Sequence, residues 1–270
     1  MGATIGRFAN RIADASFTID RKTFHLEAND GNNTNHGGFS GFHNKVWQWE
    51  ELPDGIRFSL YSPDGEGGFP GNIRVITDYR FNEDNELSVR HYAETDCATY
   101  INMTNHAYFN LCGKGKKITE HRLHIPADRI LDTTPAFIPT GKRMNVKNTP
   151  FDFTSLKPIG TDLYADHEQL LWNKGYNHCY ILKDEISVEM LEAASLYEPV
   201  TGRKMTVMTD LPAVLLYTAG YYERPDTAVC LETQFYPDTP SHSDFPSCLV
   251  LPEKAYEHCT LFHFQVQKEE

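Results

Sequence analysis

The chain has 270 residues, of which 40% are hydrophobic and 23% charged, a composition typical of a folded globular protein. It carries 37 acidic residues against 25 lysines and arginines, so its formal net charge of −12 disfavours binding to nucleic acid or anionic membranes. The sequence has no run of about 18 apolar residues and no apolar N-terminal signal segment, so we expect neither a membrane span nor secretion.

Period-two alternation of apolar and polar residues, the pattern of half-buried strands, recurs along the chain. It predicts strands over residues 55–62, 86–94 and 261–267, with Ile56, Val89 and Phe262 among the inward-facing side chains. Turn sequences rich in glycine, proline and asparagine separate such runs at residues 29–33, 62–72, 138–142 and 198–203. The glycines at 65–71 lack the spacing of a dinucleotide-binding loop, so we interpret them as a turn.

Helical signals are few. Residues 161–172 place Leu163, His167 and Leu170 on one stripe and predict a short helix, whereas residues 187–197 are expected to form a strand that pairs across the turn at 198–203. The sequence contains no repeat, low-complexity tract or linker, so we predict a single all-β domain over residues 1–270 with antiparallel strands.

The six cysteines are widely spaced: Cys97, Cys112, Cys179, Cys230, Cys248 and Cys259. Without a C-x-x-C pair they indicate neither a zinc site nor a disulfide framework, and free thiols in a cytoplasmic protein are expected. His121 and His124 are three residues apart, but strand alternation would put them on opposite faces, so no metal site is predicted.

Four polar clusters interrupt the alternation, at residues 6–12, 33–42, 102–111 and 230–238. Their notable side chains are Asn10 and Arg11, His36, His106 with Tyr108, and Glu232. Each has an ordinary structural interpretation on its own, as an ion pair, a turn residue, a hydrogen-bonded core histidine or a solvated acid. A sugar pocket would also combine these types, because a pyranose offers hydroxyls to polar groups and C–H faces to rings.

Together the clusters resemble the galactose mutarotase, or aldose 1-epimerase, family. The similarity rests on GRFANRI, NHGG-x-x-GF, SPDGEGGFPG, TNHAYFNL, IPTG, GYNH, TGRKM, LETQFYPD and FPS-x-L-V-LPE-x-Y, which occur in order over nearly the whole chain. The resemblance implies an antiparallel β-sandwich of the galactose mutarotase-like supersandwich type, with few short helices and an open groove for a hexose. The family's additional N-terminal strands have no counterpart before MGATIGR, so sheet edges would be exposed.

The resemblance also implies roles for single residues. His106 would be the general acid and Glu232 the general base, Arg11 and His36 would bind sugar oxygens, and Asn10 and Tyr108 would lie beside the sugar. Such a pair can open and close the ring of a free hexose such as galactose or glucose, which interconverts its α and β anomers with neither cofactor nor metal. The expected partner is this small-molecule sugar, with the protein acting as a monomer or homodimer.

Two positions depart from the family pattern. Asn177 stands where the family usually has an aspartate that binds sugar hydroxyls, and Leu215 stands where it often has a glutamine. An amide forms weaker hydrogen bonds than a carboxylate, and a leucine side chain forms none. A mutarotase for another sugar, or for a sugar phosphate held by Arg7 and Arg11, therefore stays open, as does a carbohydrate-binding protein without catalysis.

Overall fold

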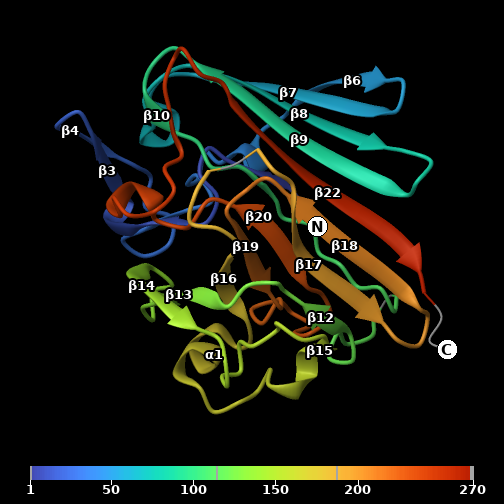
Figure 1. Ribbon diagram of the computed structural model, residues 1–270. Helices are drawn as coiled ribbons and strands as arrows, with labels where there is room; N and C mark the ends of the chain where they lie inside the picture. Colours follow the sequence, from blue (N-terminus) through green and yellow to red (C-terminus); the bar gives the residue numbers. More distant parts are fainter. Residues whose placement is uncertain (1, 114, 187, 268–270) are drawn as a thin grey trace.

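Two antiparallel sheets organise the protein, whose computed structural model describes residues 2–113, 115–186 and 188–267 (Figure 1). In spatial order, the nine-stranded sheet contains β15 (Lys157–Pro158), β12 (Arg122–His124), β17 (Leu191–Glu198), β18 (Arg203–Thr209), β22 (Tyr256–Val266), β9 (Glu86–Thr95), β8 (Ile73–Phe81), β7 (Gly55–Ser62) and β6 (Gln48–Leu52). The five-stranded sheet contains β14 (Pro139–Asn145), β13 (Arg129–Thr133), β16 (Asn177–Ile181), β19 (Ala213–Tyr217) and β20 (Cys230–Gln234).

Short strand pairs and helical turns connect the two sheets. The pairs are β1 (Thr4–Ile5) with β11 (Thr104–Asn105), β2 (Arg11–Ile12) with β5 (Thr34–Asn35), β3 (Ser16–Ile19) with β4 (Lys22–His25), and β10 (Thr99–Tyr100) with β21 (Leu249–Val250). The α-helix is α1 (Glu168–Asn173), and the 3₁₀ turns are Ala13–Ala15, Phe42–Asn44, Glu66–Gly68, Ile159–Thr161 and Thr239–Ser241. No helix among the described residues is long and apolar enough to cross a membrane.

The all-β prediction is confirmed, and the predicted strands at 55–62, 86–94 and 261–267 correspond to β7, β9 and β22. Their burial is less regular than alternation predicts. Ile56, which was expected to face inward, is exposed because neither of the two larger core clusters extends to this end of β7, and Val266 is exposed at the end of β22. The predicted strand at 187–197 corresponds to β17, although residue 187 lies outside the described residues.

The predicted helix at 161–172 is wrong in extent, since α1 covers only Glu168–Asn173. The chain first forms a 3₁₀ turn at Ile159–Thr161, and His167 then begins the helix, because its Nδ1 accepts a hydrogen bond from the Gln169 backbone N–H at 3.3 Å. Lys174 ends the helix in the left-handed conformation, with φ of 51°. Leu163 is buried, but it lies before the helix rather than on its stripe.

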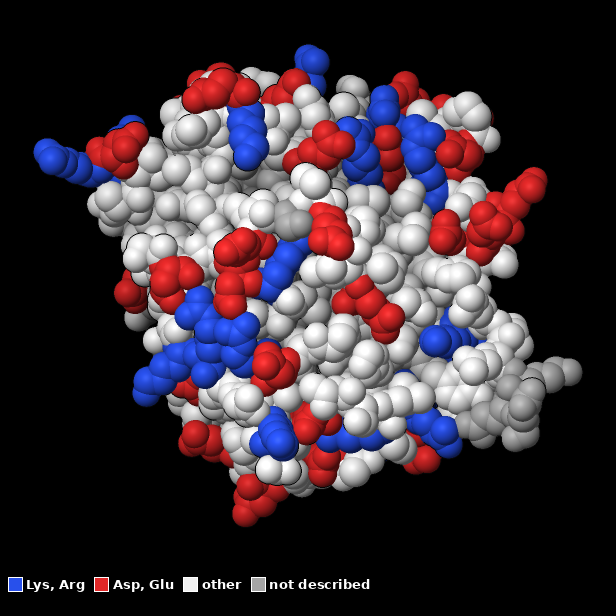
Figure 2. Space-filling model, viewed as in Figure 1, with Lys and Arg blue, Asp and Glu red and all other residues white. Residues whose placement is uncertain are grey.

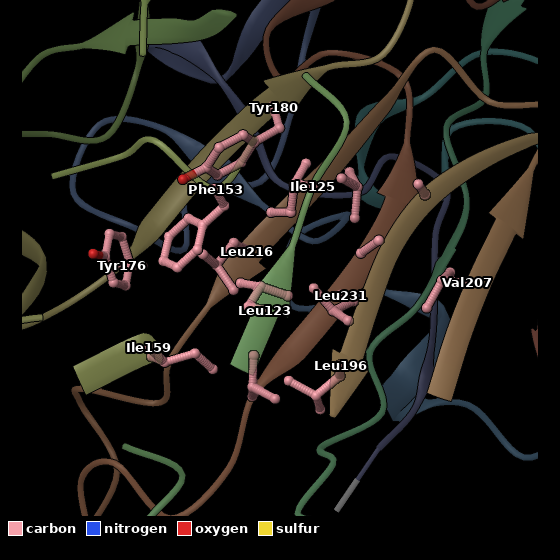
Figure 3. Close-up of a cluster of buried hydrophobic side chains, with 14 of the residues drawn as sticks. Leu123, Ile125, Phe153, Ile159, Tyr176, Tyr180, Leu196, Val207, Leu216 and Leu231 are labelled. Atoms are coloured by element: carbon pink, nitrogen blue, oxygen red, sulfur yellow. The ribbon is translucent and has the colours of Figure 1, made fainter. Parts of the chain in front are cut away.

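The main hydrophobic core lies between the two sheets (Figure 3). Leu123, Leu196 and Val207 come from the nine-stranded sheet, and Leu216 and Leu231 come from the five-stranded sheet. All are at most 1% exposed, and burial of each such side chain contributes about 1.5–3 kcal/mol. Because residues alternate along a strand, the neighbours of Leu216 and Leu231 point to the opposite face of the five-stranded sheet.

The molecular surface carries charges of both signs. On the face shown in Figure 2, acidic and basic side chains are interspersed rather than separated. All six cysteines are free thiols, as expected from their spacing.

Candidate active site

A pocket of about 270 Å³ opens on the face of the five-stranded sheet that points away from the core. Leu215 and Tyr217 of β19, Glu232 of β20 and Asn177 of β16 form its floor. In the register of the sheet, Leu215 lies opposite Glu232, and Asn177 lies opposite Tyr217. Figure 1 shows these three strands side by side in the centre of the molecule. The full lining is Asn10, Arg11, Asn35, His36, His106, Tyr108, Phe137, Asn177, Leu215, Tyr217, Tyr221 and Glu232.

All seven residues predicted as site residues therefore line one pocket, although they come from five separate segments of the chain. Sequence reasoning missed Asn35, Phe137, Tyr217 and Tyr221. Tyr217 could have been found, because strand alternation places it on the same face as Leu215. Phe137 and Tyr221 lie in turns, where no periodic signal indicates which way a side chain points.

The segment after β11 holds His106 over the pocket. The backbone N–H of His106 donates to the carbonyl of Ala3 at 2.9 Å, and the Asn105 side chain accepts from the backbone N–H of Ala107 at 3.1 Å. The Asn105 amide also donates to the Tyr79 hydroxyl at 2.8 Å. Asn105 thus positions the segment instead of lining the pocket. The polar cluster at residues 102–111 therefore contains both structural residues and residues that face the pocket.

Asn102, the other asparagine of this segment, is also structural. It is fully buried, and its side-chain oxygen accepts a hydrogen bond from the backbone N–H of Phe235 at 2.9 Å. The bond ties the segment that carries His106 to the end of β20, which carries Glu232. The relative placement of the two side chains therefore depends on a buried amide.

His36 and Asn10 form a reciprocal pair on one wall. The backbone N–H of Asn10 donates to Nδ1 of His36 at 3.1 Å, and the backbone N–H of His36 donates to the carbonyl of Asn10 at 3.0 Å. Nδ1 therefore acts as an acceptor, so a neutral His36 carries its hydrogen on Nε2. Burial, followed by the neighbouring His106 and Arg11, holds the pKa of His36 well below its usual range. His36 is consequently a neutral hydrogen-bond donor.

Gly37 follows His36 with φ of 81°, where a Cβ would come within 2.2 Å of the Gly6 carbonyl oxygen. Only glycine fits at this close approach between backbones. The glycine of the H-G-G sequence thus serves the packing of the wall.

Arg11 is fixed by two contacts, one with Asp30 and one with the pocket residue Phe137. Its Nε donates to Asp30 Oδ2 at 2.7 Å, and its guanidinium lies 4.7 Å from the centre of the Phe137 ring. Arg7, in contrast, is buried elsewhere, where it donates to the Ser62 hydroxyl and to backbone carbonyls of Ser62 and Pro63. Arg11 is thus the one arginine among the described residues that line the pocket.

His106 and Glu232 lie together at the bottom of the pocket. His106 Nε2 is 3.4 Å from Glu232 Oε1, and the Glu232 side chain has no exposed surface. Neither carboxyl oxygen of Glu232 has a hydrogen-bond partner. A buried polar group without a partner costs about 1–3 kcal/mol, so its presence marks a place where a ligand can supply the missing bonds.

Burial shifts the pKa values of Glu232 and His106 in opposite directions. It raises the pKa of Glu232 to about 8 and lowers the pKa of His106 to about 4. At a pH between these two values, Glu232 and His106 together carry one titratable proton when no sugar is bound. A carboxylate beside an imidazolium also carries one such proton in total. A hydroxyl that donates to Glu232 favours the carboxylate form, and the proton can then reside on His106.

Two aromatic rings line the pocket beside His106. The His106 ring stacks on Tyr108 with centroids 5.0 Å apart, and the edge of Tyr217 lies 6.2 Å from the His106 centroid. Burial raises the pKa of Tyr108, so its phenol stays protonated and can donate a hydrogen bond. Aromatic rings also offer apolar faces to the C–H groups of a sugar.

One group of metal-ligand types occurs among residues 2–113, 115–186 and 188–267. The ligand atoms of His106, Cys230 and Glu232 lie within 4.8 Å of one another, so these three residues could hold a thiophilic cation. Sequence reasoning predicted no metal site, and the three residues share no ligand spacing in the sequence. Two of the three, His106 and Glu232, are the residues for which the family resemblance implies the roles of acid and base.

Comparisons with known proteins show what the chain is similar to. The family model described as aldose 1-epimerase matches residues 1–263. The galactose mutarotase of Rattus norvegicus is 37% identical over 98% of this chain and 79% of its own length, and the aldose 1-epimerase of Escherichia coli is 34% identical over 98% and 80%. The crystal structure of galactose 1-epimerase from Lactobacillus acidophilus superposes with a TM-score of 0.86 at 27% identity, over 98% of this chain and 79% of that one.

Proposed function

The chain belongs to the aldose 1-epimerase family, and from this premise we propose that it is a mutarotase that interconverts the α and β anomers of a free hexose such as galactose or glucose. The observation that carries the proposal is the pair of unpartnered, fully buried Glu232 oxygens, which lie next to His106 in a sugar-sized pocket. The two groups supply the base and the acid that ring opening requires.

In the proposed reaction, Glu232 removes the proton of the anomeric hydroxyl while His106 donates a proton to the ring oxygen. The bond between the anomeric carbon and the ring oxygen breaks, which leaves an aldehyde and a hydroxyl on the fifth carbon. Rotation about the bond between the first two carbons exposes the other face of the aldehyde. On ring closure, the hydroxyl on the fifth carbon returns its proton to His106, and Glu232 gives its proton to the new anomeric oxygen. Both groups therefore end in their starting protonation states.

The remaining polar residues are proposed to bind and orient the sugar. His36 offers the hydrogen on Nε2, Arg11 offers its guanidinium, and Asn10, Tyr108 and Asn177 offer groups that can donate to hydroxyls. Because Arg11 is already held by Asp30 and Phe137, little side-chain entropy is lost when it binds. A preorganised site of this kind aligns the anomeric hydroxyl with Glu232.

The other interpretations have less support. Recognition of a sugar phosphate would call for several arginines at the pocket, but Arg7 is engaged by Ser62 and by backbone carbonyls elsewhere. A protein that only binds sugar has no need for a buried carboxyl group without partners beside an imidazole. We also propose that residues 1–270 act as one domain, because the two sheets share a core, and that the protein is cytoplasmic, because its six thiols are free.

Polarimetry on the purified protein tests the proposal. Freshly dissolved α-D-galactose and α-D-glucose are expected to reach anomeric equilibrium faster with the protein than without it. α-D-glucose 6-phosphate serves as the comparison, and a smaller acceleration is expected because Arg11 alone faces the pocket. Acceleration of the phosphate with no effect on either free hexose would contradict the proposal.

A further inference from the structure

The floor of the pocket has an apolar centre. Across the three strands, Glu232, Leu215 and Cys179 form one row, because Leu215 pairs with both Glu232 and Cys179. Leu215 and Cys179 are 4% and 3% exposed. The carboxyl group at the end of the row is therefore followed by side chains that form no strong hydrogen bond.

The position of the acid–base pair determines which part of the sugar meets this row. The anomeric carbon lies at Glu232, and its two ring neighbours are the ring oxygen and the second carbon, C-2. The ring oxygen is directed to His106, which contacts Tyr217 in the adjacent row of the floor. Since β20 is the edge strand and β11 lies beside it, the ring extends over β19. C-2 is then the carbon that lies over Leu215.

A small recess of mixed polar and apolar lining lies next to the pocket and borders Leu215 and Cys179. It shares Leu215, Asn177, Arg11, Asn10 and Phe137 with the pocket, and its other lining residues are Leu131, Thr133, Pro139, Cys179 and Pro237. Its volume is about 10 Å³, at the lower limit for one water molecule. The recess therefore leaves room for at most one water molecule beside Leu215.

On this geometry, which rests on the proposed function, we propose that Leu215 makes the enzyme indifferent to the hydroxyl at C-2. The substrate class then includes, besides the parent hexose, the sugars that differ from it only at C-2 or lack that hydroxyl. The physical reason is an asymmetry of recognition. A site that hydrogen-bonds a hydroxyl strongly rejects the analogue without it, because its own polar group is left unpaired, whereas an apolar side chain loses no partner.

Asn177 does not replace the missing contact. It belongs to the adjacent row, opposite Tyr217, and so lies diagonally from Glu232 across the floor. In the proposed placement of the sugar, its amide is left to bind a hydroxyl further around the ring than C-2. Recognition of that hydroxyl stays intact when the group at C-2 changes.

The test compares three sugars that differ only at C-2: D-galactose, D-talose and 2-deoxy-D-galactose. Exchange NMR at anomeric equilibrium gives the catalysed rate for each sugar after subtraction of the uncatalysed rate. For the wild type, kcat/KM for 2-deoxy-D-galactose is expected within about fivefold of that for D-galactose. In Leu215→Gln the ratio is expected to shift about tenfold in favour of D-galactose, because the introduced amide pairs only with the hydroxylated sugar.

Leu215→Met is the matched control, since it keeps an apolar side chain of similar volume and should leave the ratio unchanged. A wild-type preference for D-galactose over the 2-deoxy sugar above about fivefold overturns the inference, even if Leu215→Gln fails to fold. An unchanged ratio in a folded Leu215→Gln variant overturns it as well. A wild type that accelerates none of the three sugars would instead contradict the proposed function itself.

Discussion

Replacement of Glu232 by glutamine is expected to remove activity and at the same time to stabilise the fold. The Glu232 carboxyl group is fully buried without a hydrogen-bond partner, and burial raises its pKa from 4.5 to about 8. The folded protein therefore holds this proton more tightly than the unfolded chain does. The stability that this tighter proton binding contributes is fully present below pH 4.5, the pKa in the unfolded chain. It is lost as the pH rises through about 8, the pKa in the folded protein.

The size of the effect follows from the same pKa values. Between pH 4.5 and pH 7 the unfolded chain releases the proton, whereas most folded molecules still hold it. The free energy of unfolding therefore falls by about 1.36 kcal/mol per pH unit over about 2.5 pH units. Glutamine has the same shape but never ionises. The stability of Glu232→Gln relative to wild type is thus expected to rise by about 3 kcal/mol between pH 4.5 and pH 7.

Urea unfolding of both proteins at several pH values between 4.5 and 8 measures this difference. Glu253→Gln is the control, because it makes the same chemical change at an exposed glutamate. A difference in the free energy of unfolding between Glu232→Gln and the wild type that stays constant over the whole pH range would refute the reasoning. It would mean that burial does not oppose ionisation of Glu232.

Three further outcomes are expected. The pair holds one proton between the pKa of His106, about 4, and that of Glu232, about 8, so kcat/KM should fall below and above this window; a profile that keeps rising above pH 8 would contradict the pairing. Asn177→Asp should change KM for galactose or glucose about fivefold in either direction, because a carboxylate accepts charge-assisted bonds, and an unchanged KM for both would remove Asn177 from the site. Exhaustive chelation with EDTA should leave the rate unchanged, because side chains carry both proton transfers, and a loss that a divalent ion restores would count against the mechanism.

Alternation in the sequence predicted three strands of the large sheet, β7, β9 and β22, because each of them packs apolar side chains against a hydrophobic core. The 161–172 segment shows the limit of this approach. Its stripe of Leu163, His167 and Leu170 matches a helix, but Leu163 is buried from a turn before the helix begins. Tertiary packing can satisfy the same apolar residues in more than one backbone conformation.

The site divides in a similar way. The motifs indicated His106 and Glu232, but only the structure brings their side chains to 3.4 Å and leaves the Glu232 oxygens without partners. The sequence also grouped Arg7 with Arg11, whereas the fold sends the two guanidinium groups to different places. Neighbours in a sequence can share a motif without sharing a role, because the direction of each side chain depends on local backbone geometry.

The central claim is that His106 and Glu232 together catalyse anomer exchange, and one measurement tests it most directly. The mutarotation rate of freshly dissolved α-D-galactose is followed by polarimetry with the wild type, Glu232→Gln and His106→Asn, at equal concentrations of folded protein. The account predicts acceleration by the wild type and a rate lower by at least about 10²-fold in each variant. A folded Glu232→Gln variant with a rate near that of the wild type would contradict it.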